Sequence, residues 1–269
     1  MSSEVETSLD ISGHRSSQRF LDFARNDNSK ETTRCLFTAL TIYHDYAGHS
    51  AATNMAIDEA LLESATVPLI RFYRWHSPAL SFGYFGNFSD VAGYGSERDL
   101  VRRWTGGGIV FHGDDLTYSI VIPASDLVFE QSSASIYETI HCALRSALIA
   151  NGKRAELAAV AAVSDCRGHE DLTVGGRRYR ENSCFANPVR ADVLIDNRKV
   201  AGAAQRRTRQ GLLQQGSIQG VDLRNGFTER FVRELAHRLE TRSLPGSVER
   251  RAQEIAAQKY GTEDWLRKR

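Results

Sequence analysis

Short runs of β-prone residues, separated by turn residues, occupy most of the chain up to about position 220. The pattern predicts strands at Cys35–Tyr43, Leu69–Trp75, Ala79–Tyr84, Ile109–His112, Leu116–Pro123, Asp192–Ile195, Lys199–Ala204 and Leu212–Gln219. Gly113-Asp114-Asp115 and Asp196-Asn197 are turn signals. Two hairpins are therefore expected, one over 109–123 and one over 192–204.

Helical periodicity is found in fewer places. Thr53 is expected to cap a helix Asn54–Glu63, and Ser135–Asn151 carries an apolar stripe. A short helix is expected over 89–100, and the tail predicts helices Thr228–Leu239 and Val248–Lys259 with a stop at Gly261. Strands outnumber crossover helices and short turns join them. This favours an α+β fold, with an antiparallel or mixed sheet and helices packed on it, over a doubly wound parallel sheet.

Composition divides the chain of 269 residues unevenly. Residues 1–34 are rich in Ser, Asp, Asn, Glu, Thr and Arg, and predict a flexible leader. Residues 35–245 form the expected main domain, and 246–269 a helical tail packed on it. Four scattered cysteines, with neither a secretory signal nor an apolar run of membrane-spanning length, predict a cytosolic protein with free thiols. A net charge of +1 argues against a general electrostatic grip on nucleic acid.

The segment 101–119 carries the first candidate chemistry. Gly106-Gly107-Gly108 permits close backbone approach and positive φ, so its amides could cradle a carboxylate, a thioester oxygen or a phosphate. It is neither a Walker A loop nor a dinucleotide fingerprint, and the alternative is a tight turn at a sheet edge. His112 by itself is more often a satisfied structural histidine than a base. Arg102 and Arg103 either bind acidic groups or lie on a solvated face.

A thiol and an ammonium form the second candidate site. Cys184, between Ser183 and Phe185, would ordinarily be a small buried hydrophobe. Lys199 within a few ångströms would lower the cysteine pKa from about 8.5 and favour the thiolate, which attacks acyl carbonyls. Cys166 and His169 have a C-x2-H spacing without a second pair, so no metal site is expected. The basic group Arg206, Arg207 and Arg209 is either a solvated hairpin end or a docking point for an acidic carrier protein.

These motifs, taken together, resemble the lipoate–protein ligase and octanoyltransferase family, which is related to the biotin protein ligases. The resemblance covers about 37–266. Its motifs are Arg102-Arg103-Trp104-Thr105-Gly106-Gly107-Gly108 with His112, the helix from Asn54 to Leu62, the run from Arg198 to Arg207, Gly211-Leu212-Leu213-Gln214-Gln215-Gly216-Ser217-Ile218, and Lys259-Tyr260-Gly261-Thr262-Glu263-Asp264-Trp265. It implies a catalytic domain like that of class II aminoacyl-tRNA synthetases, a mixed sheet with flanking helices.

The resemblance also implies roles for individual residues and partners. Lys199 would contact the acyl carbonyl and Cys184 would carry the acyl group as a thioester. The residues implied in substrate binding are Arg103, Thr105, Gly106, Gly107, Gly108, His112, Gly202, Ala203, Ala204, Gly216 and Ser217. The donor would be octanoyl-acyl carrier protein, and the acceptor a lysine of a lipoyl domain of a 2-oxoacid dehydrogenase or of glycine-cleavage H protein. No metal, nucleotide, nucleic acid or membrane is implied, and a monomer is expected.

Two alternatives stay open. An ATP-dependent lipoate–protein ligase would use ATP and Mg²⁺ and no cysteine; the full glycine triplet and Asp192 in Ala191-Asp192-Val193 favour it. A carrier-binding homologue without catalysis is the other, because Gln215 stands where this family commonly has histidine. Cys184-Phe185 ahead of Lys199, and the run from His112 to Ser119, favour the cysteine-type octanoyltransferase.

Overall fold

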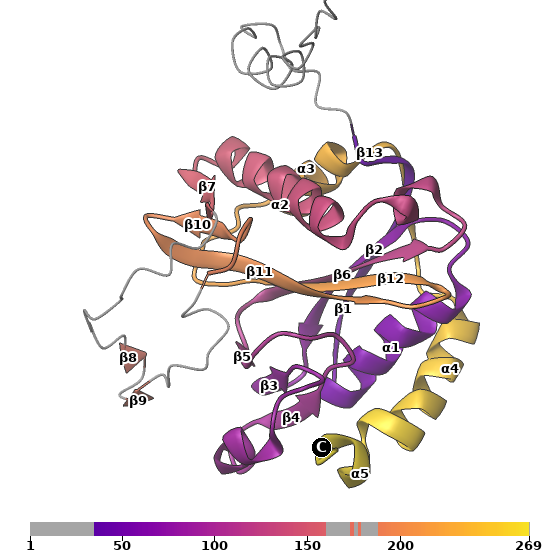
Figure 1. The fold of residues 1–269 in the computed structure, drawn as a ribbon, viewed down its shortest axis with the longest axis vertical. Helices are drawn as coiled ribbons and strands as arrows, with labels where there is room; N and C mark the ends of the chain where they lie inside the picture. Colours follow the sequence, from indigo (N-terminus) through magenta and orange to yellow (C-terminus); the bar gives the residue numbers. More distant parts are fainter. Residues whose placement is uncertain (1–34, 160–172, 175–176, 179–187, 269) are drawn as a thin grey trace, which may run out of the picture. The chain divides into compact units, whose positions relative to one another are not determined.

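A mixed β-sheet forms the centre of the protein. The computed structural model describes residues 35–159, 173–174, 177–178 and 188–268. In this part of the chain the largest sheet has eight strands, in the order β13-β1-β2-β6-β12-β11-β10-β7 (Figure 1). They are β1 (Phe37–His49), β2 (Leu69–Trp75), β6 (Leu116–Pro123), β7 (Ala155–Leu157), β10 (Val193–Ile195), β11 (Arg198–Arg207), β12 (Gly211–Ile218) and β13 (Ala236–Arg242). Strand β1 runs parallel to β2 and β13, and the other pairs are antiparallel. The expected mixed-sheet α+β class is confirmed.

Helices cover both faces of this sheet (Figure 1). Helices α2 (Ser133–Ala150) and α3 (Phe227–Leu235) lie on one face, and α1 (Ala51–Ser64) and α4 (Gly246–Ile255) on the other. The predicted stripe of α2 is fully buried: Ile136, Ile140, Leu144 and Leu148 are all at 0% exposure. Helix α1 is buried nearly all round because it lies between the sheet and α4.

A second, smaller sheet packs against the glycine-rich segment 105–108. Its order is β4 (Asp99–Arg102), β3 (Ala79–Phe82), β5 (Val110–His112), and β3 is parallel to β4 and antiparallel to β5. The expected hairpin over 109–123 is therefore wrong. The turn at Gly113 exists, but β5 pairs with β3 while β6 crosses into the large sheet, because β6 is buried at every position between β2 and β12. The expected hairpin around Asp196-Asn197 is confirmed, and both residues have positive φ.

Four local predictions differ from the structure. The first strand continues to His49, and the helix that follows is capped by Ser50, whose side chain accepts from the Thr53 amide. The segment 89–100 is two 3₁₀ turns, η2 (Phe88–Asp90) and η3 (Ala92–Tyr94), followed by β4, because Gly93 and Gly95 disfavour a continuous helix. The predicted helix Thr228–Leu239 ends at Leu235. The chain then becomes extended, because Ala236–Arg242 pairs with β1 and satisfies its backbone there.

The C-terminal tail packs on α1. Helix α4 continues into a π-helical turn, η5 (Ala256–Tyr260), which ends at Gly261, and α5 (Glu263–Leu266) follows. Residues 35–269 form one compact unit. Residues 1–34, expected to be a leader, lie outside the described residues, as does most of 160–187. Within 160–187 the structure describes only a short two-stranded sheet, β8 (Thr173–Val174) with β9 (Arg177–Arg178).

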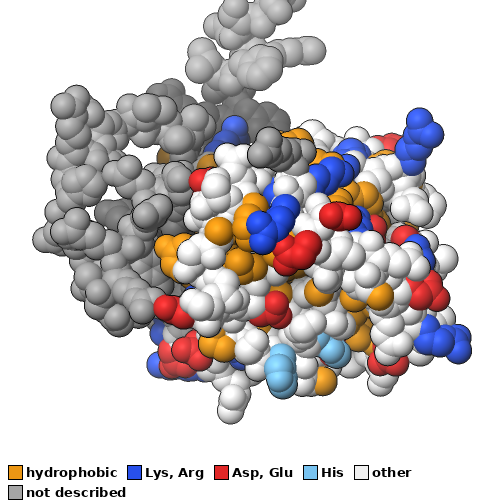
Figure 2. All heavy atoms as spheres, turned by 90° about the horizontal axis from the view of Figure 1, so that it is seen from below, with side chains coloured by type: hydrophobic (Ala, Val, Ile, Leu, Met, Phe, Trp, Pro, Cys, Tyr) orange, Lys and Arg blue, Asp and Glu red, His pale blue; other side chains and the backbone are white. Residues whose placement is uncertain are grey.

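No helix within the described residues is long and apolar enough to cross a membrane. On the face seen in Figure 2, acidic and basic side chains are interspersed among uncharged ones, as the net charge of +1 leads one to expect.

Candidate active site

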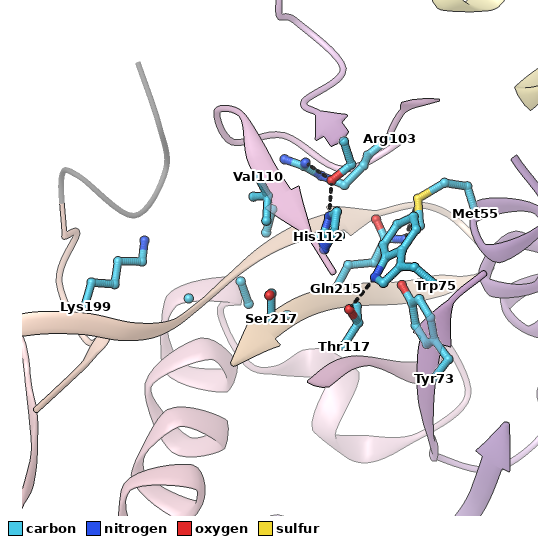
Figure 3. A pocket seen from close by; sticks show the side chains of 15 residues that line it. Met55, Tyr73, Trp75, Arg103, Val110, His112, Thr117, Lys199, Gln215 and Ser217 are labelled. Atoms are coloured by element: carbon cyan, nitrogen blue, oxygen red, sulfur yellow. Dashed lines mark hydrogen bonds between the residues drawn. The ribbon is translucent and has the colours of Figure 1, made fainter. Parts of the chain in front are cut away.

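A pocket opens between the small sheet and the central strands of the large sheet (Figure 3). The empty space in it, open solvent at its mouth included, is about 460 Å³. Lys199 lies at one end of the lined region and Met55 at the other. Its lining residues are Met55, Tyr73, Trp75, Ser81, Arg103, Val110, His112, Thr117, Lys199, Gly202, Ala203, Ala204, Gln215, Gly216 and Ser217.

Lys199 is a nearly buried cation at the pocket. Its side chain is 6% exposed, and Nζ lies 2.8 Å from Oδ2 of Asp192, which is fully buried. A buried charge needs such a partner because the interior solvates it poorly. Gly202 lies against this ammonium: a Cβ there would be 2.6 Å from Nζ. The strand needs glycine at 202 so that the lysine can pass.

His112 is held as a neutral ring. Nδ1 lies 2.8 Å from Asp115 Oδ2 and Nε2 2.6 Å from Ser81 Oγ. A carboxylate only accepts, so Nδ1 carries the proton and Nε2 accepts from the serine hydroxyl. Burial lowers the pKa of His112, although Asp115 opposes this. The ring also stacks on Trp75, at 4.0 Å between centroids. His112 therefore lines the pocket as a fixed, satisfied group, and its part in substrate binding stays a prediction.

Arg103 fixes the glycine-rich segment above the pocket. Nη2 donates to the carbonyls of Gly106 (3.1 Å) and Gly108 (2.9 Å), and Nη1 donates to Ser81 Oγ (2.7 Å). Gly107 has a φ of +86°, as the triplet predicted. The sequence did not single out Gly83, where a Cβ would overlap the Gly107 carbonyl oxygen. This close approach lets the segment lie on the small sheet.

Arg102 has a different role, neither of the two expected. It is 1% exposed, and its guanidinium donates to four backbone carbonyls, those of Tyr84, Gly86, Trp265 and Leu266. The Trp265 indole returns a hydrogen bond to the Arg102 carbonyl at 2.9 Å. Arg102 thus attaches the C-terminal tail to the small sheet.

A buried polar network lies beneath the pocket. Asp58, at 0% exposure, accepts from Arg71 (2.9 Å), Ser119 (2.7 Å), Tyr73 (3.2 Å) and Gln215 (2.7 Å). Thr105 donates to the Gln215 carbonyl oxygen at 2.8 Å. Gln215 therefore bridges the glycine-rich segment and α1. The residue that replaces the family's common histidine thus has a structural role in this buried network.

Replacing Asp58 with alanine is expected to lower the free energy of unfolding by about 3–5 kcal/mol, because it leaves the fully buried Arg71 with only part of its charge compensation. Urea unfolding measures this. Glu240→Ala, which removes one partner of an exposed ion pair with Arg242, is the matched control and should change stability by less than about 1 kcal/mol. If both variants lost a similar amount of unfolding free energy, Asp58 would not be the main charge partner that stabilises the buried Arg71.

A second buried histidine predicts acid sensitivity. Burial lowers the pKa of His141 to about 4, against about 6.5 in an unfolded chain. Between these values the unfolded chain binds a proton that the folded chain does not. The free energy of unfolding should therefore contain the full contribution of His141 above pH 6.5. It should decrease by about 3 kcal/mol as the pH falls to about 4. Urea unfolding at pH 7 and pH 4.5 measures the decrease. His141→Gln should have a smaller pH dependence than the unsubstituted protein, and an equal dependence would refute this origin.

These observations can be set beside known proteins. A family model described as the lipoyl protein ligase A/B catalytic domain matches residues 50–259. The chain belongs to this family.

Curated relatives of the lipoyl protein ligase A/B family are named octanoyltransferase LipM. The protein of Oceanobacillus iheyensis is 37% identical over 177 residues, which is 62% of this chain and 59% of that protein. That of Clostridioides difficile is 35% identical over 181 residues, 63% of this chain and 62% of that protein. The chain thus spans about three fifths of the length of these relatives.

Solved structures show the shared fold. A lipoate-protein ligase A bound with ATP has a TM-score of 0.62 at 20% identity, covering 86% of this chain and 98% of that one. The bipartite lipoate protein ligase of Thermoplasma acidophilum, studied with its E2 lipoyl domain, has a TM-score of 0.60 at 20% identity, covering 86% and 96%. At this identity the likeness establishes the fold of the lipoate ligases and no more.

The pocket brings together most of the residues that the family resemblance implied. Arg103, His112, Lys199, Gly202, Ala203, Ala204, Gly216 and Ser217 line it. The glycine-rich segment itself does not line the pocket: its residues Thr105, Gly106, Gly107 and Gly108 are not among the lining residues. The Ala203 amide donates to the Tyr137 hydroxyl, and the part of Ala203 in substrate binding stays a prediction. Cys184, Cys166 and His169 lie outside the described residues.

Seven lining residues were not among the site residues expected from the sequence: Met55, Tyr73, Trp75, Ser81, Val110, Thr117 and Gln215. Tyr73 and Trp75 occupy alternate positions of β2 after the charged Arg71, and Thr117 on β6 lies two residues after the charged Asp115. Polar groups at alternate positions of otherwise apolar strands were the available signal. Among the described residues no cluster of three or more His, Cys, Asp or Glu side chains could hold a metal ion.

The basic group near 206–209 is partly engaged in contacts within the protein, although Arg207 and Arg209 are exposed. The Arg207 guanidinium donates to the carbonyls of Phe129 and Gln131, each at 2.6 Å. Arg206 lies over the rings of Tyr84 and Trp104. Arg207 is thus a structural tie between β11 and the start of α2, and docking of a carrier at this group stays a prediction.

Proposed function

We propose that this protein is an octanoyltransferase of protein lipoylation. Octanoyl-acyl carrier protein is the donor, and the acceptor is a lysine of a lipoyl domain or of glycine-cleavage H protein. The observation that carries the proposal is a nearly buried ammonium, Lys199, at one end of a partly apolar pocket in a chain whose curated relatives are named octanoyltransferases. The protein would act in the cytosol as a monomer.

The first step is transfer to Cys184. The Cys184 thiolate attacks the thioester carbonyl of the donor, a carbon–sulfur bond forms, and the carrier thiolate leaves and takes up the proton that Cys184 lost. Lys199 favours the thiolate over the thiol and stabilises the negative charge that develops on the carbonyl oxygen. The apolar part of the pocket, with Val110, Met55 and Trp75, receives the octanoyl chain.

The second step is transfer to the acceptor. A neutral lysine amine of the acceptor attacks the thioester on Cys184, an amide bond forms, and the Cys184 thiolate leaves. The attacking nitrogen loses one proton, and the departing Cys184 sulfur takes it up, so the free thiol is restored. Neither step needs a metal or a nucleotide.

A lipoate–protein ligase is the second candidate, because the solved structures that share the fold are ligases. In that case the same pocket would hold lipoate and its adenylate, and Cys184 would have no role in transfer. Attachment of lipoate to the acceptor lysine would then depend on ATP and Mg²⁺.

Intact-protein mass spectrometry after mixing the pure protein with octanoyl-acyl carrier protein, without ATP, separates the two. The transferase gives an octanoyl-sized adduct that hydroxylamine removes and that peptide mapping assigns to Cys184. No adduct, together with ATP-dependent loading of lipoate onto a lipoyl domain, would replace the proposal by the ligase. Binding of a lipoyl domain without turnover of either acyl donor would indicate a carrier-binding homologue without catalysis.

A further inference from the structure

Helix α2 presents two polar side chains to the segment that carries Asp192. Tyr137 and His141 are four residues apart, so they lie on the same face of the helix, and their rings are 4.1 Å apart. Tyr137 is not among the lining residues of the acyl pocket. Both side chains instead bind the turn 189–192, which precedes β10. The proposed reaction leaves this pair unexplained.

Tyr137 binds the carboxylate that pairs with Lys199. Its hydroxyl donates to Asp192 Oδ1 at 2.6 Å and accepts from the Ala203 amide at 3.1 Å. The other oxygen of Asp192 accepts from the Val189 amide at 2.7 Å and lies 2.8 Å from Lys199 Nζ. A carboxylate held by two donors besides the lysine has little freedom to turn, because each hydrogen bond to a buried charge is strong.

His141 holds the backbone of the same turn. Nδ1 donates to the Ala191 carbonyl at 2.6 Å, and Nε2 lies 3.3 Å from the Tyr118 hydroxyl. Ala191 has a φ of +66°, a conformation that residues with a side chain rarely adopt. Such a conformation persists only where surrounding contacts determine it. The turn is therefore fixed at its carboxylate by Tyr137 and at its carbonyl by His141.

Lys199 has little room on its other side. Gly202 packs against Cε and Nζ, and its missing Cβ would also come 3.0 Å from Asp192 Oδ1. The ammonium thus sits between the Gly202 backbone and a carboxylate whose place is set from α2. Its position at the end of the pocket depends on Asp192.

We infer that Tyr137 is a positioning residue: by fixing the Asp192 carboxylate it fixes the Lys199 ammonium where the acyl carbonyl is bound. The inference rests on the proposed function for its kinetic consequence, and on the structure alone for the position of Lys199. Tyr137 touches neither substrate nor the reacting atoms, so its loss should act on turnover and leave the acyl pocket unchanged.

The test is Tyr137→Phe in the full-length protein, measured by octanoyl transfer to a lipoyl domain. One charge-assisted hydrogen bond is lost, so kcat should fall about tenfold while the KM for octanoyl-acyl carrier protein stays within about twofold. In the background of Asp192→Asn, which removes the charge through which Tyr137 acts, Tyr137→Phe should have little further effect. Tyr46→Phe, a hydroxyl deletion on β1 at a half-exposed position, is the matched control and should keep full activity.

An unchanged kcat in Tyr137→Phe, or effects of Tyr137→Phe and Asp192→Asn that multiply independently, would overturn the inference. Acetic anhydride labelling, followed by peptide mass spectrometry, measures the reactivity of Lys199 relative to exposed lysines and needs no acyl substrate. The rate of this labelling should change in Tyr137→Phe and stay the same in Tyr46→Phe. If octanoyl transfer is absent from the unsubstituted protein, the proposed function fails, and an unchanged labelling rate is then what would refute the positioning role.

Discussion

Replacing Cys184 with alanine is expected to abolish the octanoyl adduct and to lower octanoyl transfer by at least about 10⁴-fold. The reason is chemical: without the thiolate no covalent intermediate forms, and removal of a nucleophile leaves only the residual effect of substrate binding and electrostatic stabilisation. Quenched transfer assays with octanoyl-acyl carrier protein and a lipoyl domain, with mass spectrometry of the enzyme, measure both quantities.

Cys142→Ala is the matched control for this substitution. Cys142 is a half-buried free thiol on α2, and burial raises the pKa of its thiol, so it is a poor nucleophile near neutral pH. It should keep full transfer and still form the adduct. Full transfer by Cys184→Ala would remove the cysteine-type mechanism.

Replacing Lys199 with methionine is expected to lower transfer by about 10²–10³-fold while the fold is retained. Methionine fills a similar volume but lacks the charge that, in the proposed mechanism, favours the Cys184 thiolate and the developing oxyanion. Asp192 would keep its hydrogen bonds from Tyr137 and the Val189 amide. The rate of Cys184 octanoylation should also move its pH midpoint upward, toward the ordinary cysteine value of about 8.5.

The variant Lys199→Arg tests whether a positive charge at this position is enough for octanoyl transfer. The guanidinium is larger than the ammonium, and the space beside Gly202 is already filled by Lys199, so this variant should recover only a small part of the activity. A Lys199→Met enzyme with a transfer rate and pH midpoint like those of the unsubstituted protein would show that the ammonium takes no part in the reaction.

The sequence by itself determined the fold class and most of the pocket. A run of β-prone residues placed β2 at its observed bounds. The helical stripe of α2 proved to be fully buried, because periodicity records which face meets the core. The motif residues Arg103, His112, Lys199 and Gly202 come from three stretches of chain, and all four line one pocket.

Only the tertiary structure decided how distant segments meet. The extended Ala236–Arg242 follows a helix and has no apolar alternation, and it is a strand because β1 offers an edge to pair with. Likewise, β5 and β6 are neighbours in sequence that enter different sheets. Arg102 looked like a ligand-binding or surface residue, whereas four carbonyls from segments far apart in the sequence bind it.

The same limit applies to the site. Lys199 was recognisable as a motif, but its partner Asp192, the Tyr137 hydroxyl behind it and the strained Ala191 meet only through the packing of α2 on the sheet. Local patterns encode which face of an element is buried. The pairing of one buried charge with another depends on register and helix packing, which a single sequence does not display.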